Sequence, residues 1–309
     1  MGIIKDLLYK ISPKCVIKSN FLKENVYPYY HIVADGERPH ISHLYDFKSK
    51  DEFIVDVDLL KSNYNPILLE DILKGEIKEK SFILTFDDGL REIYTNIYPI
   101  LKKKGLSAIF FVNPDFVDNN QMMHKHRLSV LLYHILKFDY SDEVFGLIAQ
   151  ICGFRYANIT HFKKEFMALK FDKEKELDEV FKVLNIDEKK YLQENKLYIS
   201  KSEIQEMIND GFYFGGHTMS HRSLLTLPFE EQKNEIINSV EWLKDNFKID
   251  YSLFAFPFSD RGVLLRLIKE VFEYDPNIIL FGNSGIKKDV DARILQRFSL
   301  ETPGKNTKK

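Results

Sequence analysis

The sequence predicts an α/β fold, because short apolar runs alternate with stretches of helical period along most of the chain. Residues 81–86 (SFILTF) predict a strand, residues 90–104 a helix with one apolar face, and residues 107–112 (SAIFFV) the next strand. Such alternation indicates a parallel sheet or an α/β barrel. Further strands are expected at 253–258, 277–281 and 294–300.

Local signals mark where several of the helices begin and end. Gly105 stops the first helix, and Ser200 with Glu203 fits a capping box ahead of another. A long helix is expected to begin near Phe229, where apolar residues recur with helical spacing.

One long stretch breaks the alternation of strand and helix. Residues 115–199 carry only helical patterns, and a structureless loop of that length is improbable in a compact domain. We therefore predict a discontinuous barrel over 1–114 and 200–303, interrupted by a helical insertion over 115–199. Residues 304–309 form a short polar tail.

The composition excludes several classes of protein. Of 309 residues, 44% are hydrophobic and 29% charged, which is ordinary for a globular protein, and the net charge of −2 offers nothing to attract nucleic acid. No apolar run reaches the roughly 20 residues of a membrane span, and no secretory leader is recognisable, so a cytoplasmic protein is expected. Cys15 and Cys152 form no ligand pattern and are expected to be two buried thiols.

The first candidate for chemistry is the pair of acids in Asp87-Asp88-Gly89. Adjacent carboxylates repel each other unless a cation neutralises them, and these two directly follow an apolar strand. Most such triplets are solvated turns. The functional interpretation is a metal ligand beside a general base, because barrel enzymes carry their active sites at the carboxyl ends of strands.

The second candidate is the pair His217 and His221. Imidazoles four residues apart can share one face of a helix and bind one metal, although structural histidines are commoner. Thr218 follows the first histidine, so the HExxH pattern with its internal base is absent. Gly215-Gly216, just before His217, fits a close backbone approach at the end of a strand.

Three segments in this order resemble the polysaccharide deacetylase family (NodB homology, carbohydrate esterase 4). They are SFILTFDDG (81–89), GFYFGGHTMSHRSL (211–224) and FAFPFSD (254–260), and the resemblance covers about residues 25–114 and 197–300 but not the helical insertion. It implies an irregular (β/α) barrel. The implied reaction is hydrolysis of the N-acetyl group of an N-acetylhexosamine in an oligo- or polysaccharide, or in a precursor of a cell-surface glycan.

The resemblance also implies roles for individual residues. Asp88, His217 and His221 match the metal ligands, and Asp87 matches the catalytic base. Two imidazoles and a carboxylate suit a divalent metal, zinc first, with cobalt or nickel as substitutes. Phe258, which follows Pro257, occupies the family's Tyr/Phe position, and a backbone N–H near it is expected to help bind the oxyanion.

The first departure from the family concerns the partner of the base. The family places an arginine beside the catalytic aspartate, but Ala255 stands at that position here. Arg222, Arg261 or Arg297 would have to replace it. Arg297, on the last predicted strand, is the preferred candidate.

The second departure concerns the general acid. The family carries a late histidine, whereas the last histidine of this chain is His221. His31, which follows a run of apolar and aromatic residues, is the preferred substitute. His124, His126 and His134 in the insertion are the alternatives.

Three functions are compatible with these departures. They are an active deacetylase, a metal-dependent amidase or esterase acting on a non-carbohydrate substrate, and a sugar-binding protein that has lost catalysis. The presence of Asp87, Asp88, His217 and His221 argues against the third, and the first is the preferred interpretation.

Overall fold

The structure is a computed structural model that describes residue 17 and residues 24–301. Cys15 and the predicted tail 304–309 lie outside the described residues. The described chain forms two compact units, an α/β unit and a helical unit. The helical unit contains residues 36–46 and 118–197, and the α/β unit contains the rest. No helix in the described ranges is long and apolar enough to cross a bilayer.

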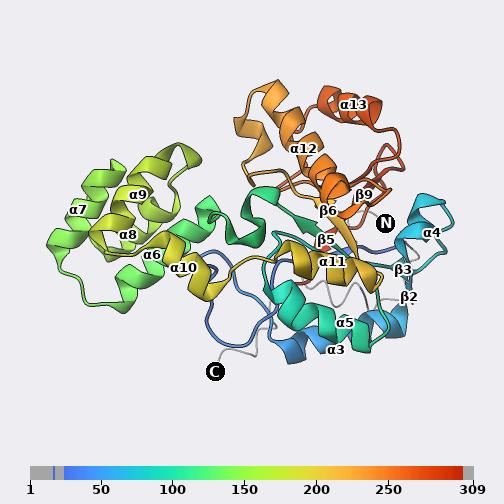
Figure 1. Ribbon diagram of the computed structural model, residues 1–309, viewed down its shortest axis with the longest axis horizontal. Helices are drawn as coiled ribbons and strands as arrows, with labels where there is room; N and C mark the ends of the chain where they lie inside the picture. Colours follow the sequence, from blue (N-terminus) through green and yellow to red (C-terminus); the bar gives the residue numbers. More distant parts are fainter. Residues whose placement is uncertain (1–16, 18–23, 302–309) are drawn as a thin grey trace. The chain divides into compact units, whose positions relative to one another are not determined.

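The α/β unit is built on one parallel sheet of eight strands in the order β10-β1-β4-β5-β6-β7-β8-β9 (Figure 1). Every neighbouring pair in it is parallel, which requires crossover connections and explains the alternation of strand and helix in the sequence. The strands are β1 (Pro28–Tyr30), β4 (Leu84–Phe86), β5 (Ala108–Val112), β6 (Tyr213–Gly216), β7 (Leu253–Ala255), β8 (Ile279–Gly282), β9 (Ile294–Gln296) and β10 (Phe298–Ser299).

A single stretch of chain brings the two ends of this sheet together. β9 pairs with β8 and β10 pairs with β1, yet only Arg297 separates β9 from β10. The Arg297 N–H donates to the Gly282 carbonyl at 3.1 Å, and the Leu300 N–H donates to the Tyr29 carbonyl at 3.2 Å. The sheet is therefore a nearly closed barrel, which confirms the predicted fold class.

Two predicted strands are shorter than expected. The stretch 81–86 divides into β3 (Ser81–Phe82), which pairs with β2 (Asn65–Pro66), and the barrel strand β4. The predicted strand 253–258 ends at Ala255, because Pro257 has no N–H to donate to a neighbouring strand.

Helices surround the barrel, and their ends follow the sequence signals. Ser200 and Glu203 form the predicted capping box of α11, and α12 begins at Phe229 as predicted. The predicted helix 90–104 opens with a π-helical turn, η1 (Ile93–Ile97), and continues as α5. The helices of this unit are α3 (Lys50–Asn63), α4 (Leu69–Leu73), α5 (Tyr98–Lys103), α11 (Lys201–Asn209), α12 (Phe229–Phe247) and α13 (Leu265–Tyr274), with a short turn η4 (Leu224–Thr226).

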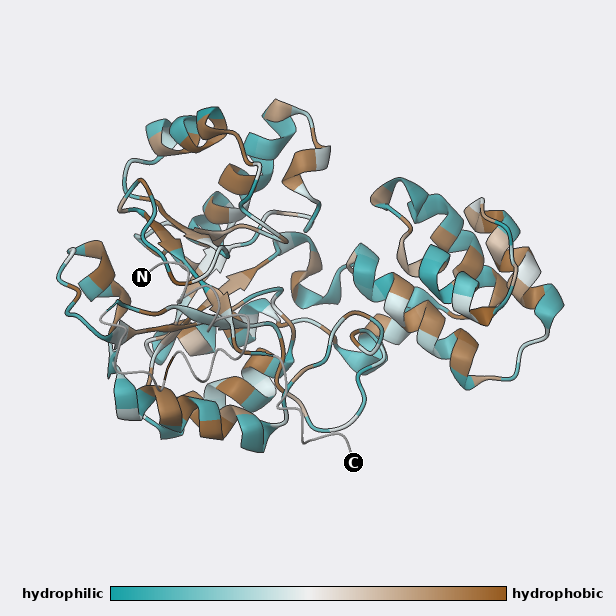
Figure 2. Ribbon diagram, turned by 180° about the vertical axis from the view of Figure 1, so that it is seen from behind, coloured by the Kyte–Doolittle hydropathy of each residue, from teal (hydrophilic) through white to brown (hydrophobic). Residues whose placement is uncertain are grey.

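The barrel strands bury side chains on both faces. Ile109 and Phe111 of β5 pack with Leu253 and Phe281 in one cluster, whereas Phe110 packs in a second cluster beneath the helices. A Cβ atom at Gly215 would lie 2.6 Å from the Phe111 ring, so this position requires glycine. Figure 2 shows the resulting concentration of hydrophobic residues in the strands of this unit.

The described residues of the helical unit form helices, turns and connecting loops, and they include residues 36–46, which the predicted insertion 115–199 does not contain. Its core contains Leu128, Ile148, Phe162 and Leu177. Cys152 is buried in the same core, as expected. The elements are α6 (His124–Lys137), α7 (Asp142–Cys152), α8 (Ile159–Met167), η3 (Phe171–Lys173), α9 (Glu174–Val183) and α10 (Glu188–Asn195), and η2 (Pro114–Asn119) leads into them.

Candidate active site

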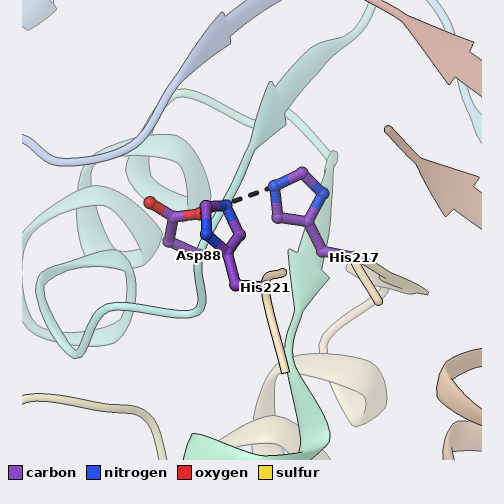
Figure 3. Close-up of side chains that lie close together, drawn as sticks. All are labelled: Asp88, His217 and His221. Atoms are coloured by element: carbon purple, nitrogen blue, oxygen red, sulfur yellow. Dashed lines mark ion pairs between the residues drawn. The ribbon is translucent and has the colours of Figure 1, made fainter. Parts of the chain in front are cut away.

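Three side chains from two strand ends converge at the carboxyl end of the barrel (Figure 3). Asp88 follows β4, whereas His217 and His221 follow β6. The Asp88 Oδ1 atom lies 3.2 Å from His221 Nε2 and 3.5 Å from His217 Nε2. All three ligand atoms lie within 4.8 Å of one another, so they could contact one ion.

The two histidines do not share a helical face, contrary to the interpretation of their spacing. They lie on an irregular loop in which Thr218 and His221 adopt left-handed backbone conformations (φ 65° and 52°) that an α-helix excludes. The buried side chain of Asn113 supports this loop. Its Nδ2 donates to the carbonyls of His217 and Thr218, the latter at 3.0 Å.

The environment of these residues fits a divalent metal. His217 Nδ1 donates to the Ala255 carbonyl at 2.8 Å, so Nε2 is the ring nitrogen that faces Asp88. Burial raises the pKa of Asp88, but the nearby imidazoles outweigh burial and hold this pKa well below its usual range. An ionised carboxylate and two imidazole nitrogens form a donor set typical of catalytic zinc.

Asp87, next to the metal ligand, is paired with Arg297. The guanidinium donates two hydrogen bonds to the carboxylate, Nη1 to Oδ1 at 2.7 Å and Nη2 to Oδ2 at 2.9 Å. Arg297 is completely buried, and its guanidinium lies about 5 Å from the ring centroids of both Tyr29 and Phe111. Burial raises the pKa of Asp87, yet the charge of Arg297 outweighs this effect and lowers it.

Of the three arginines that could replace the one missing at Ala255, only Arg297 contacts Asp87 among the described residues. Arg222 lies 3.5 Å from Glu231, and Arg261 is exposed on the loop after β7. The catalytic role of Arg297 stays a prediction.

His31 directly follows β1 and is bound by Glu301. Glu301 was not predicted as a site residue from the sequence. One Glu301 oxygen accepts the backbone N–H groups of His31 and Ile32, and the other lies 2.6 Å from His31 Nδ1. Burial lowers the pKa of His31, but Glu301 and the nearby aspartates outweigh it and raise the pKa to about 10. The sequence did carry a signal for Glu301, because this acid directly follows the predicted strand 294–300, just as Asp87 directly follows the predicted strand 81–86.

The other histidines proposed for the acid role lie in the helical unit, and each has neighbours there. His124 forms an ion pair with Glu174, and His134 Nε2 lies 3.0 Å from the Tyr140 hydroxyl. His126 packs against the ring of His40. Their contacts are those of structural side chains.

Phe258 lies beside the histidine loop, whereas Pro257 is buried. The ring of Phe258 is 4.7 Å from that of His221, and the residue is 55% exposed with a left-handed backbone (φ 57°). Asp88 also has a positive φ, of 72°. Backbone strain of this kind concentrates at functional sites, which fits a site made from these loops.

Comparison with known proteins agrees with this geometry. A family profile described as polysaccharide deacetylase matches residues 74–137 and 160–277, more than half of the chain and including part of the predicted insertion. The motif resemblance had left that insertion unmatched. A comparison with curated protein sequences finds no match.

Solved structures show the same fold at low sequence identity. The Streptococcus pyogenes deacetylase PplD in complex with acetate aligns with a TM-score of 0.58 at 14% identity, over 90% of this chain and 92% of that one. IcaB from Ammonifex degensii aligns at 0.55 and 18% identity, over 91% and 93%. A de-N-acetylase from Aggregatibacter actinomycetemcomitans aligns at 0.53 and 16% identity, over 89% and 94%. The chain therefore belongs to the polysaccharide deacetylase family, whose members are hydrolases that act on carbon–nitrogen bonds other than peptide bonds.

Proposed function

We propose that this protein is a divalent-metal-dependent carbohydrate deacetylase that removes the N-acetyl group of an N-acetylhexosamine in a cell-surface glycan or its precursor. The observation that carries the proposal is Asp87, held by Arg297 next to three converging ligand atoms. Family membership and the similarity in fold to a deacetylase bound to acetate and to a de-N-acetylase support the same reaction.

Asp88, His217 and His221 would hold the metal, with zinc as the first choice and cobalt or nickel as substitutes. When bound, the metal supplies Lewis acidity toward the acetyl carbonyl and a lowered pKa for a bound water. Asn113 and the Ala255 carbonyl hold the histidine loop and the His217 tautomer in the conformation that binding needs.

Asp87 is the general base in this proposal. It accepts a proton from the attacking water as the oxygen of that water bonds to the acetyl carbon. Arg297 holds both carboxylate oxygens and lowers the pKa of Asp87, so the base is ionised at neutral pH. The small side chain at Ala255 is consistent with this arrangement, because the arginine reaches the base from the position between β9 and β10 instead of from β7.

His31 is the proposed general acid. When the carbon–nitrogen bond breaks, acetate leaves and the sugar nitrogen must gain a proton. His31 is protonated at neutral pH because Glu301 raises its pKa, and Glu301 also fixes the orientation of the ring. The N–H of Phe258 is proposed to stabilise the oxyanion of the tetrahedral intermediate.

The test combines metal content with acetate release from N-acetylglucosamine oligomers. We expect about one divalent ion per chain, lost in His217→Ala/His221→Ala together with activity. Asp87→Asn should retain the metal but lose about 10²–10⁴-fold in kcat. Asp58→Asn, an exposed acid that pairs with Lys104, serves as the matched control and should behave as wild type.

Three results would overturn parts of this proposal. A protein that binds no zinc or cobalt would remove the metal mechanism. Turnover of acylated non-carbohydrate amides but not of sugars would identify an amidase instead. Binding of glycans without any acetate release would identify a non-catalytic sugar-binding protein.

A further inference from the structure

The loop after β7 is held by one side-chain amide. Asn283 follows β8, and its Nδ2 donates to the carbonyl of Phe258 at 2.6 Å. Its Oδ1 accepts the N–H of Asp260 at 3.4 Å. The amide thus bridges the backbone on both sides of Ser259, much as a neighbouring strand would.

A partly buried network of hydrogen bonds fixes Asn283 and this loop together. The Asp260 carboxylate accepts the Ser284 hydroxyl at 2.8 Å and Gln296 Nε2 at 2.7 Å, and Gln296 Oε1 accepts the Ser284 N–H at 2.7 Å. A side chain at Gly282 would overlap both Gln296 and Asp260, so glycine permits the close approach. The loop is therefore tied to both β8 and β9.

Phe258 needs such support more than its neighbours do. Its left-handed backbone is unfavourable for a residue with a Cβ atom, and its ring, 55% exposed, contributes little packing to hold it. Its N–H has no acceptor among the residues that the structure describes, while its ring lies against the metal ligand His221.

We propose that Asn283, supported by Asp260 and Gln296, is a positioning residue that holds the Phe258 N–H where it can bind the oxyanion. This inference rests on the proposed function. Asn283 touches neither the substrate nor the metal ligands in this proposal and acts only through the backbone of Phe258.

Asn283→Asp is the sharpest variant to test this role. It keeps the acceptor for the Asp260 N–H but replaces the donor with a carboxylate oxygen that repels the Phe258 carbonyl. Loss of one oxyanion donor lowers kcat by about 10²–10³-fold, and a displaced donor should lower it by about 10–100-fold. KM should change by less than about threefold, and metal content should not change, because neither the binding of sugar nor the metal ligands are altered.

The control is Asn246→Asp, which removes an equivalent amide-to-carbonyl hydrogen bond, 2.7 Å to Trp242, on the exposed side of α12. An activated aryl acetate is the substrate, because it forms the same tetrahedral oxyanion without a sugar subsite. One outcome would be that wild type hydrolyses this substrate, Asp87→Asn does not, and Asn283→Asp has the same kcat as Asn246→Asp. The inference would then fail while the proposed function stands. If Asp87→Asn has the same kcat as wild type, the proposed function fails instead.

A second measurement needs no substrate. Arg261 is exposed in the same loop, so trypsin should cleave after it faster once the loop is released. We expect faster cleavage in Asn283→Asp and Asn283→Ala than in Asn246→Asp at equal thermal stability. Equal cleavage rates would overturn the claim that Asn283 holds the loop, whatever the enzyme acts on.

Discussion

Two regions at the carboxyl end of the barrel build the site by different means. The proposed metal-binding region, formed by Asp88, His217 and His221, consists of loops with left-handed backbone at two of these three residues. The closing segment, residues 296–301, contains the end of β9 and all of β10, and three of its side chains bind other parts of the site. In it Gln296 binds Asp260, Arg297 binds Asp87, and Glu301 binds His31.

This difference separates two tasks. The metal-binding region gathers ligand atoms in one place, so its variants should act on metal affinity. In the proposed mechanism, the closing segment sets the charge and orientation of the base, the acid and the oxyanion loop, so its variants should retain the metal and act on kcat. The family profile ends at residue 277, before the closing segment, although both regions meet in one site.

Arg297→Met should have the largest effect in the closing segment. It leaves the buried Asp87 charge without a partner, which should lower the free energy of unfolding by about 3–5 kcal/mol. Without the cation the pKa of Asp87 rises, so kcat should fall by about 10³-fold within the range of lost acid–base catalysis. Denaturant unfolding and acetate release measure the two effects.

The double variant Arg297→Met/Asp87→Asn distinguishes charge burial from lost packing. Because it removes both charges, it should regain much of the stability that Arg297→Met alone loses. A double variant as unstable as the sum of the two single variants would show that Arg297 acts mainly through its volume.

Glu301→Gln should lower kcat by about 10–100-fold and leave metal content unchanged. Burial lowers the pKa of His31, and the charge of Glu301 raises it to about 10. Without that charge the effect of burial is less opposed, so the pKa should fall. Protonated His31 is the proposed donor, so activity is lost as pH rises through this pKa, and the loss should begin at lower pH in the variant. A pH profile of kcat with an unmoved alkaline limb would contradict the assignment of His31 as the acid.

Asn113→Ala tests the metal-binding region, where a variant should lower metal affinity and not kcat of the metal-loaded protein. It leaves two carbonyls of the histidine loop without their donor, so we expect metal affinity to fall about tenfold or more. Excess zinc should restore activity, whereas it should not restore Glu301→Gln. Asn63→Ala, which removes a 2.7 Å bond to Leu59 in α3, is the matched control. A loss of activity that zinc does not reverse would place Asn113 in the catalytic machinery.

The sequence was sufficient for features that are local in the chain. The acid pair at a strand end, the histidine pair and the capping box of α11 all depend on residues within a few positions of one another. The barrel fold followed from the alternation of elements and from the family resemblance, and the structure confirms it.

What the sequence could not predict depends on how the barrel closes. Glu301 reaches His31 across 270 positions, and only the pairing of β10 with β1 brings them together. The spacing of the two histidines suggested a helix, because no local sequence signal predicts the left-handed backbone at Thr218 and His221. Arg297 could be predicted only as the preferred one of three candidate arginines, since the gap at Ala255 indicates that a cation is needed but not which residue supplies it.

Thr85→Val should give the smallest effect on stability and activity. It tests how far Thr85, in strand β4, orients the guanidinium of Arg297. Thr85 Oγ1 accepts Arg297 Nη1 and donates to the Pro28 carbonyl, both at 3.2 Å. Valine keeps the shape but loses both bonds, so unfolding should become easier by about 1–2 kcal/mol. The two bonds from Arg297 to Asp87 remain, so kcat should change by less than about threefold. Thr95→Val, at an exposed position, is the control. A loss in kcat close to that of Arg297→Met would show that Thr85, and not the carboxylate, sets the orientation of the guanidinium.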